Sequence, residues 1–360
     1  MIGDGSAYVS KEKPEKRGDR DEVIRFKNPN KKIIFNDLIV GDVEVNTTDL
    51  GDFVIAKDME TPIFHLTNVI DDYEMGITHI IRGQDHIPNT PRQILIQEAI
   101  GAQRPVYAHI PLILSPDKSK LSKRDGAVNV VEYKNLGYLP EAIINFLAFL
   151  GWNPGDDREI LTREEFIKEF NMKKIQKGGA VFNIEKLNWF NKKYIQMLSD
   201  KKFMELVVKF MPSEIKNFPN YDKKVEKIIP VIKERIEKFG DIKDMHKRGE
   251  LKYFFEQPEY ETKSLMWKDE KNIQNTKKYL EEILNLLEKI QDNNFNSVLI
   301  KDAVWNFATE KGRGNVLWPM RYALSGIDKS PDPFILASLL GKKETISRIE
   351  TAVKKINSIK

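Results

Sequence analysis

Between residues 61 and 114, three short apolar runs alternate with two segments of helical pattern, an arrangement that few fold classes accommodate. The runs are TPIFHLTNV, THIIRG and VYAHIPLIL. The clearer helical segment is NTPRQILIQEAIG, in which Asn89 is placed to cap the helix, Pro91 falls in its first turn and Gly101 ends it. Strand, helix and strand at this spacing predict a parallel α/β sheet, in which ligands bind beyond the carboxyl ends of the strands.

The pattern changes near residue 139, after which nearly every segment is helical. LPEAIINFLAFLGW predicts a buried helix that begins at Pro140 and ends at Gly151. LTREEFIKEF carries Thr162 and Glu165 at capping-box positions. Helical patterns continue from FNIEKLNWFNKKYIQML to DPFILASLLGKKETISRIETAVKKI, with no evident repeat of fixed period. We therefore expect an α/β part followed by an all-α part.

Residues 22–57, upstream of the first run, are rich in β-branched residues. KKIIFNDLIVGDVEVN predicts two strands that meet in a hairpin near Gly41 and Asp42, and DFVIAK predicts a further strand. The first 21 residues are polar and lack the apolar core of a signal peptide, so we expect a poorly ordered lead-in.

The formal net charge of +4 on 360 residues is too small to indicate a nucleic-acid partner by itself. The chain has no cysteine, which excludes disulfides and thiolate zinc sites and agrees with a cytoplasmic location. No segment approaches the apolar length that crosses a bilayer, so no membrane partner is expected. A polyanionic partner would therefore have to be recognised by a local cluster of basic residues.

SKLSKRDG, residues 119–126, is such a cluster, between the apolar runs AHIPLILSPDK and AVNVVEY. It contains a single glycine, whereas a phosphate cradle built from backbone N–H groups is glycine-rich. Lys120, Lys123 and Arg124 instead supply mobile positive charges that suit a phosphate whose charge moves during a reaction. A solvated turn is the alternative interpretation, because short basic motifs often occur without a ligand.

The segments around this cluster resemble the class I glutamyl-tRNA synthetases of bacterial type. KLSKR at 120–124 is similar to the KMSKS-type signature of that family, within the longer match HIPLILSPDKSKLSKRDGAVNV. TPIFHLTNVIDDYEMGITHIIRGQDHIPNTPRQILI resembles its second Rossmann half, and WPMRYALSGIDKSPDPFILASLLGKKETISRIETAV resembles the end of its helical anticodon-binding region. The resemblance covers essentially the full chain and is weakest over about 200–300.

The resemblance implies an α/β plus all-α fold. Its parts would be a partial class I Rossmann-type parallel sheet, an α/β insertion remnant and a C-terminal helical anticodon-binding domain. The implied domains are a remnant of the connective, acceptor-binding insertion at 1–52, the second half of the Rossmann catalytic domain at 53–126, a helical stem-contact region at 127–199 and the anticodon-binding domain at 200–360.

The implied activity is that of a glutamate–tRNA ligase in protein synthesis. ATP would activate L-glutamate to glutamyl-adenylate, and the glutamyl group would pass to the 3′ end of tRNA-Glu. Lys123 would stabilise charge on the leaving pyrophosphate, Lys120 would help to hold the mobile loop, and Ser122 completes the implied catalytic set. Magnesium is expected with ATP. Nothing in the sequence indicates a nucleophile system, so catalysis would be positional and electrostatic.

The implied substrate sites lie around the same strand ends. Arg82, at the end of THIIRG, would hold the glutamate carboxylate in bidentate fashion, with a structural ion pair as the alternative. The other residues implied to bind the substrate glutamate are Phe64 and Asn68. Many family members have tyrosine at the position of Phe64, so one hydroxyl contact is absent here. The implied ATP-binding set is Lys123, Lys120, Arg124, Ile113, Leu114 and Asp85, with Ile113 and Leu114 flanking adenine through their backbone.

Five further positions carry separate expectations. Asp71 and Asp72 would reach the acceptor end of tRNA, and the alternatives are that they bind a metal or cap a helix. Arg235 would read the anticodon, or belong to a solvated helix face. His109 is expected to be a satisfied core histidine and not a catalyst. Zinc-bearing members carry cysteine in an AYxC segment where this chain has Ser10, so no zinc is expected.

We find neither the HIGH-type motif of the family nor its first Rossmann half, and Met1 aligns within the insertion between the halves. The chain is thus expected to be an N-terminally truncated synthetase, either a monomer or the partner of a separate N-terminal fragment. Alone it should bind tRNA and activate glutamate very poorly. ATP–pyrophosphate exchange at ordinary enzyme rates would contradict this expectation. Whether tRNA-Gln is a second substrate stays open.

Other classes of protein fit the sequence less well. A non-catalytic tRNA-binding protein derived from a synthetase has little need of the intact KLSKR. The glutamine-specific relative has a β-barrel anticodon region, whereas residues 200–360 are strongly helical in pattern. The short tRNA-modifying relative lacks such a tail altogether.

Overall fold

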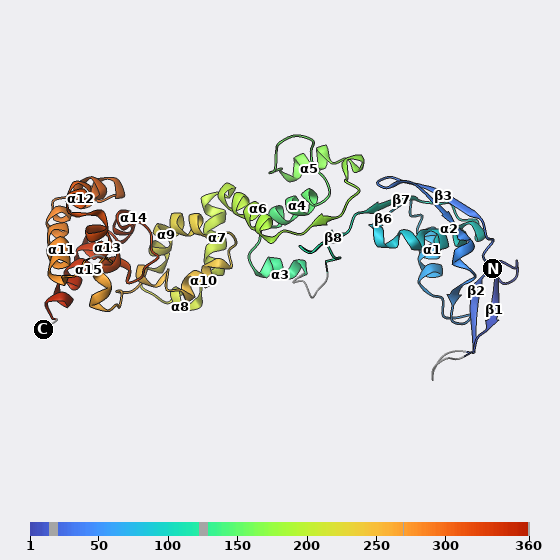
Figure 1. Ribbon diagram of the computed structural model, residues 1–360, viewed down its shortest axis with the longest axis horizontal. Coiled ribbons are helices and arrows are strands. Elements are labelled where there is room, and N and C mark those ends of the chain that lie inside the picture. The colour runs from blue at the N-terminus through green and yellow to red at the C-terminus, as the bar shows by residue number, and fades with distance from the viewer. Residues whose placement is uncertain (14–20, 122–128, 269, 359–360) are drawn as a thin grey trace. The chain divides into compact units, whose positions relative to one another are not determined.

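The computed structural model describes residues 1–13, 21–121, 129–268 and 270–358 (Figure 1). The chain forms two compact units. The first unit comprises residues 1–129 and 141–190, and the second comprises residues 130–140 and 191–360. Within the described ranges, no helix has both the length and the apolar character needed to cross a membrane.

An antiparallel sheet at the start of the first unit has the strand order β1-β2-β5. Its strands are β1 (Ala7–Lys11), β2 (Glu22–Phe26) and β5 (Phe53–Ala56). The expectation of a poorly ordered lead-in is therefore wrong for residues 7–11. These residues pair with β2 along their whole length, and Ala7 is buried in the same core as Ile24 and Phe26. Pairing with the backbone of β2 and the burial of Ala7 hold this polar segment as an edge strand.

A second sheet of the first unit has the order β4-β3-β7-β6. The strands are β3 (Lys32–Asp37), β4 (Gly41–Asn46), β6 (His79–Gly83) and β7 (Val106–Ile110). The predicted parallel pairing is confirmed, since β6 and β7 run parallel in continuous register and helix α2 (Thr90–Ala99) connects them. The predicted hairpin is also confirmed as β3 and β4. Its turn lies at residues 38–40, however, and Gly41 opens β4 with a φ of 94°.

The first of the three apolar runs is a helix and not a strand. Helix α1 (Phe64–Glu74) contains most of TPIFHLTNV. Leu66 and Val69 lie three positions apart and face the core, and Val69 is fully buried there. A short apolar run satisfies both the helical and the strand period, which is why the pattern alone was ambiguous.

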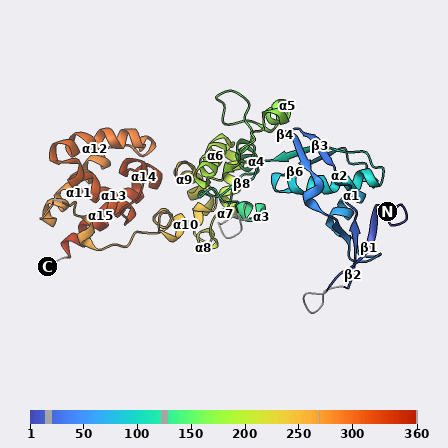
Figure 2. The ribbon, with the colours of Figure 1, turned by 45° about the vertical axis from the view of Figure 1, so that its right-hand side comes forward.

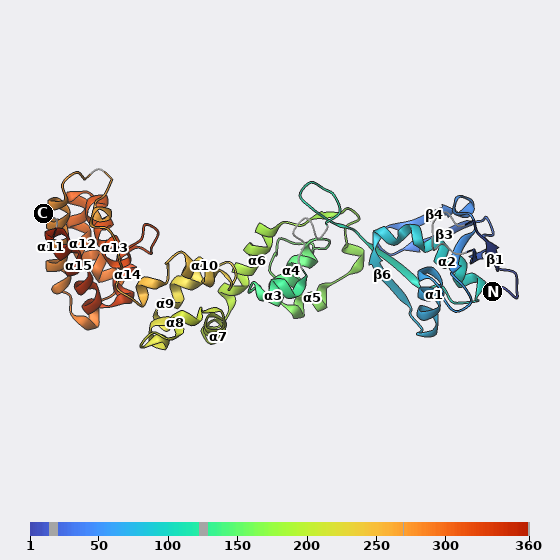
Figure 3. The same ribbon diagram turned by 90° about the horizontal axis from the view of Figure 1, so that it is seen from below.

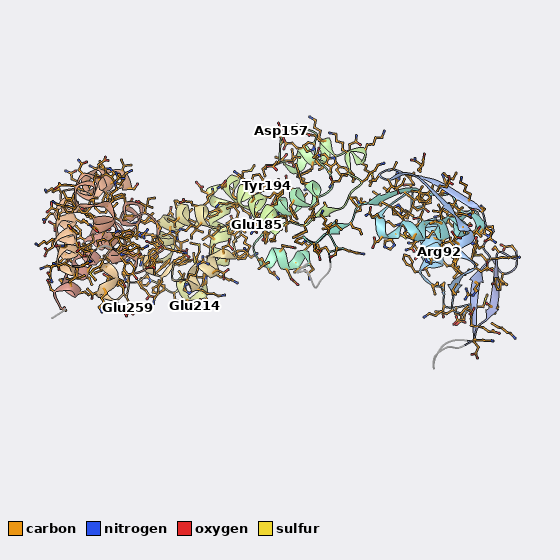
Figure 4. The ribbon with its side chains drawn as sticks, viewed as in Figure 1. Arg92, Asp157, Glu185, Tyr194, Glu214 and Glu259 are labelled. Atoms are coloured by element: carbon orange, nitrogen blue, oxygen red, sulfur yellow. The ribbon has the colours of Figure 1, made fainter. Side chains whose placement is uncertain are left out.

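Helices α1 and α2 pack against each other, and both contribute to the core that contains Phe35 of β3 and Tyr107 of β7 (Figure 2). Arg92 on α2, labelled in Figure 4, has its guanidinium carbon 5.8 Å from the ring centre of Phe53. The two helices therefore connect the two sheets of this region through one core.

The rest of the first unit follows the predicted helix signals. Helix α4 (Pro140–Phe149) begins at Pro140 as predicted; Ala142 and Phe146 are buried, whereas Ile144 is about half exposed, so the helix is buried on one side only. Helix α5 (Arg163–Glu169) carries the predicted capping box. Strands β8 (Ile113–Leu114) and β9 (Ala180–Val181) pair in parallel, and α6 (Ile184–Met197) contains the unit boundary.

Replacing Thr162 by Ala is expected to lower the free energy of unfolding of the first unit by about 1 kcal/mol. The Thr162 hydroxyl accepts a hydrogen bond from the Glu165 amide at 3.2 Å, and the Glu165 carboxylate accepts one from the Thr162 amide at 2.7 Å. Urea unfolding measures the change. Thr162→Ser keeps a capping oxygen and serves as the control; equal losses in both variants would contradict the capping role.

Beyond α6 the described residues of the second unit form helices joined by turns and loops, with no strand among them, as the helical pattern predicted (Figure 3). Its helices are α3 (Val130–Asn135), α7 (Asp200–Phe210), α8 (Ser213–Lys216), α9 (Tyr221–Arg235), α10 (Asp241–Lys247), α11 (Ile273–Glu288), α12 (Ser297–Lys311), α13 (Arg313–Ser325), α14 (Pro333–Leu340) and α15 (Lys342–Asn357). The final helical pattern is divided at Gly341, whose φ of 83° ends α14 before α15 begins.

Segment 130–140 belongs to the second unit because of one close backbone approach. The Phe239 amide donates to the Gly137 carbonyl at 3.1 Å, and the Gly240 amide donates to the Leu136 carbonyl at 3.0 Å. A Cβ on Gly137, which has a φ of 86°, would lie 2.7 Å from the Gly240 nitrogen. Only glycine satisfies both the positive φ and the lack of space at residue 137.

Candidate functional site

The carboxyl ends of β6 and β7 bring together Arg82 and His109. The Arg82 Nε donates to the His109 Nε2 at 3.1 Å, and the Arg82 Nη2 donates to the Thr90 hydroxyl at 2.8 Å. Thr90 begins α2 and is fully buried, as is His109. Since parallel neighbours end at the same edge of a sheet, Arg82 lies where ligands bind in sheets of this kind.

Asp37, at the end of β3, lies behind His109. Its carboxylate is 2.6 Å from the His109 Nδ1 and also accepts hydrogen bonds from the amides of Ile39, Val40 and His109. Burial raises the pKa of Asp37, but these hydrogen bonds together outweigh burial and bring it below its usual value. Asp37 is therefore a buried carboxylate that is ionised at neutral pH.

His109 is the satisfied core histidine that the sequence predicted. Burial lowers its pKa against the opposing effect of Asp37, so the ring is neutral at neutral pH. A neutral ring that contacts a carboxylate through Nδ1 carries its proton there, which leaves Nε2 to accept from Arg82. Sequence reasoning missed Asp37, although an acidic residue in phase with the buried Ile33 and Phe35 of β3 is a readable signal.

Helix α1 contributes the other residues that were predicted to bind glutamate. The Asn68 side-chain oxygen accepts a hydrogen bond from the amide nitrogen of Gln93, which is fully buried on α2, at 2.7 Å. This hydrogen bond uses the Asn68 oxygen and leaves the Asn68 amide nitrogen as a donor for another group. Phe64 is 52% exposed, and its ring centre lies 6.3 Å from that of His86. Gln93, like Asp37, was not identified from the sequence.

The two acidic residues of α1 differ in their surroundings. Burial raises the pKa of Asp72, and the charge of Arg82 opposes that rise. Asp71 is exposed. Both lie near the C-terminal end of α1, whose N-cap position is Ile63, so the alternative that either caps this helix is wrong.

The basic loop contacts the segment that follows Arg82. The Lys120 Nζ is 2.6 Å from the Asp85 carboxylate, and this hydrogen bond lowers the pKa of Asp85. After β8 the chain makes a tight turn that brings Lys120 back beside the strand. The amide of Leu121 donates to the Ile113 carbonyl at 3.0 Å. The turn is held by Asp117, whose pKa falls to about 2 mainly through the hydrogen bond from the Ser115 hydroxyl. The predicted residues Ser122, Lys123 and Arg124 lie outside the described residues.

The predicted ATP-binding residues Ile113 and Leu114 form β8, which pairs with β9. Leu114 also forms a bridge to Lys120, so the strand and the start of KLSKR are adjacent. Apart from the undescribed segments, no group of three or more His, Cys, Asp or Glu side chains is placed to hold a metal ion.

Arg235 lies at the end of α9 in the second unit. Its Nη1 is 3.0 Å from the Glu250 carboxylate, which also accepts from the Arg248 Nε at 2.5 Å. These residues line a charged hollow of about 420 Å³ together with Lys238 and Lys329. Arg235 is thus a paired, partly buried cation on a concave surface.

Comparison with known proteins agrees with this geometry. Residues 2–189 match the family described as tRNA synthetases class I (E and Q), catalytic domain, and residues 202–353 match the family described as anticodon binding domain. The glutamate–tRNA ligase 1 of Caldanaerobacter subterraneus subsp. tengcongensis is 38% identical over 338 residues, which cover 92% of this chain and 68% of the relative. The glutamate–tRNA ligase 2 of Thermoanaerobacter pseudethanolicus is 37% identical over 357 residues, 96% and 71% of the two chains.

Solved structures give the same result. A glutamate–tRNA ligase from Elizabethkingia meningosepticum, in complex with its amino acid, has a TM-score of 0.78 and 37% identity, and the match covers 92% of this chain and 68% of that one. A glutamate–tRNA synthetase from Elizabethkingia anophelis has a TM-score of 0.74 at the same identity and coverage. The chain thus spans about two thirds of the length of the relatives that it matches.

Proposed function

This chain belongs to the class I tRNA synthetases for glutamate and glutamine, and from that premise we propose that it is a glutamate–tRNA ligase. It uses ATP to activate L-glutamate to glutamyl-adenylate and transfers the glutamyl group to the 3′ end of tRNA-Glu. The combination of a class I catalytic domain with an anticodon-binding domain supports this activity. The names of its relatives support glutamate as the amino acid.

The observation that carries the amino-acid assignment is the anchored guanidinium of Arg82. A planar cation whose Nε is held by His109 at 3.1 Å can receive a carboxylate in bidentate geometry on its outer nitrogens. Asn68 presents its amide nitrogen to the same substrate, and Phe64 lies beside it on α1. These three residues form the proposed glutamate site.

The nucleotide binds between β8 and the basic loop in this proposal. An oxygen of the α-carboxylate of glutamate attacks the α-phosphorus of ATP. The bond between that phosphorus and the oxygen bridging to the β-phosphate breaks, and pyrophosphate leaves with the charge it gains. Lys120, Ser122, Lys123 and Arg124 stabilise that charge, while Asp85 holds Lys120 at 2.6 Å. Ile113 and Leu114 flank adenine through backbone atoms. Mg²⁺ enters with ATP, bound mainly by phosphate oxygens and water.

The second unit binds tRNA in this proposal, with Arg235 near the anticodon and Asp71 and Asp72 of the first unit near the acceptor end. Contacts from its lysines to the RNA backbone weaken with salt. The proposed family regions are 1–52, 53–126, 127–199 and 200–360, and the first two share both sheets and one core. The proposed location is the cytoplasm. The proposed state is a monomer or the partner of a separate N-terminal fragment. The proposed tRNA is tRNA-Glu, with tRNA-Gln as a second candidate.

Formation of glutamyl-tRNA from labelled glutamate, ATP, Mg²⁺ and tRNA-Glu tests the function, with the Arg82→Ala chain as the background. Binding of tRNA-Glu is measured in the same preparation by filter retention. Charging above the Arg82→Ala background supports the ligase even where the rate is low. Binding of tRNA-Glu with charging no higher than that background would instead favour the non-catalytic tRNA-binding protein.

Replacing Phe64 by Tyr is expected to strengthen glutamate binding by about 3- to 10-fold, the effect of one added hydrogen bond. Phe64 is half exposed and lies beside the proposed glutamate site, so a hydroxyl fits without repacking. Isothermal titration with L-glutamate measures the change, and Phe64→Leu is the control without a hydroxyl. Equal affinities for the Tyr and Leu variants would contradict a substrate contact at this position.

A further inference from the structure

We propose that Asp37, His109 and Thr90 are positioning residues, which hold one edge of the Arg82 guanidinium so that its outer end faces the glutamate carboxylate. This inference rests on the proposed function, in which Arg82 binds that carboxylate. The three residues come from the ends of β3 and β7 and from the start of α2.

The geometry leaves a defined set of donors on Arg82. A guanidinium has five N–H groups in a fixed plane. His109 takes the one on Nε at 3.1 Å, and Thr90 takes one on Nη2 at 2.8 Å. Within the described part of the chain, both hydrogen bonds fall on the edge formed by Nε and Nη2. One N–H on Nη2 and two on Nη1 remain, which is the pair of nitrogens that an end-on carboxylate requires.

His109 can accept from Arg82 only while its Nε2 carries no proton. The Asp37 carboxylate lies 2.6 Å from the His109 Nδ1 and keeps the ring proton on that nitrogen. Asp37 is itself held by the backbone, because the amides of Ile39 and Val40 donate to its carboxylate at 3.0 and 2.9 Å. The orientation of Arg82 is thus set through a chain of buried groups that ends on the backbone of the β3–β4 turn.

The arrangement also explains how a partly buried arginine stays in place before substrate arrives. An arginine side chain loses rotamer entropy when it is fixed. The hydrogen bonds that Arg82 donates to His109 and Thr90 oppose that loss in the free protein, so substrate binding does not have to order the side chain. Removal of these partners should therefore weaken glutamate binding without a direct contact to glutamate.

The test measures the dissociation constant of L-glutamate by titration calorimetry for His109→Leu, His109→Gln, Thr90→Val and Arg82→Ala. His109→Leu is expected to weaken binding about tenfold, and Thr90→Val about threefold. His109→Gln, whose side-chain oxygen can accept from Nε, should recover most of the affinity. In the double variant Arg82→Ala/His109→Leu, binding should be no weaker than in Arg82→Ala alone.

Thr47→Val is the matched control, because Thr47 is another fully buried threonine of the first unit, bonded to Lys31 and not to Arg82. Unchanged glutamate affinity in His109→Leu, with a loss in Arg82→Ala, would overturn this inference alone. Unchanged affinity in Arg82→Ala would overturn the proposed glutamate site itself. Additive losses in the double variant would show that His109 acts through the fold and not through Arg82.

A spectroscopic measurement keeps the proposal testable if a buried variant fails to fold. The nitrogen-15 shifts of His109 in the unaltered chain report which ring nitrogen carries the proton. The expected result at neutral pH is a neutral ring protonated on Nδ1, together with a slowly exchanging Arg82 Nε–H. A ring protonated on Nε2, or on both nitrogens, would overturn the proposal.

Discussion

Replacement of Arg82 by Ala is expected to weaken L-glutamate binding about 100-fold while the affinity for ATP changes by less than about twofold. The loss corresponds to about 3 kcal/mol, which is typical when one partner of a partly buried, hydrogen-bonded charge pair is removed. Burial already lowers the pKa of Arg82, so the side chain lies where water competes weakly for the carboxylate. Titration calorimetry with each substrate separately measures both quantities.

Two variants make this prediction specific. Arg82→Lys keeps the charge and loses the planar fork, so it should bind glutamate more tightly than Arg82→Ala and about tenfold more weakly than the unaltered chain. Arg92→Ala removes an arginine of the same unit that packs on Phe53, and it should leave glutamate affinity unchanged. A loss in Arg92→Ala as large as that in Arg82→Ala would mean that charge alone, and not the site at β6, attracts glutamate.

The replacement of Lys123 by Ala should slow the formation of glutamyl-adenylate about 100- to 1000-fold. That range is typical for removal of one group that stabilises charge developing in a transition state. Glutamate affinity should stay within about twofold, because Lys123 is assigned to the pyrophosphate. Single-turnover formation of the adenylate at high enzyme concentration measures the rate relative to the unaltered chain, which keeps the comparison valid for a slow enzyme.

Lys118 offers the matched control for Lys123. It is a lysine five positions earlier with a φ of 68°, and asparagine tolerates this backbone conformation. Lys118→Asn should therefore remove one charge near the loop with little effect on the rate. Comparable rates for Lys118→Asn and Lys123→Ala would contradict a specific role for Lys123 and favour the solvated-turn interpretation of KLSKR.

Several elements could be predicted from residues close together in the sequence. The capping box of Thr162 and Glu165, the start of α4 at Pro140 and the helix after Asn89 all depend on contacts within about four positions. The helix α1 shows where this reasoning is insufficient, since TPIFHLTNV fits both periods until the core around Val69 selects the helix. The strand β1 shows the same for a polar segment, because its partner β2 makes it a strand.

The candidate site divides in a similar way. Arg82 and Lys120 were identified from their place at predicted strand ends, whereas the residues that hold Arg82 were either missed or assigned only to the core. Asp37 contacts His109 across 72 positions of sequence, and Lys120 contacts Asp85 across 35. Gln93 holds Asn68 across 25 positions. Such pairs have no local pattern, because they exist only after the strands and helices have packed.

Periodicity, caps and turn residues were enough to establish an α/β part followed by helices. The assignment of KLSKR to a phosphate came from its resemblance to a family signature, because a solvated turn also fits these residues. These properties reside in short segments, whose local conformational preferences act before any long-range contact forms. The identity of the group behind Arg82, and the direction in which its guanidinium points, depend on the pairing of β3, β7 and β6 in one sheet. Only that pairing removes Asp37 and His109 from water and places the hydrogen bonds of a buried carboxylate within reach of a cation on another strand.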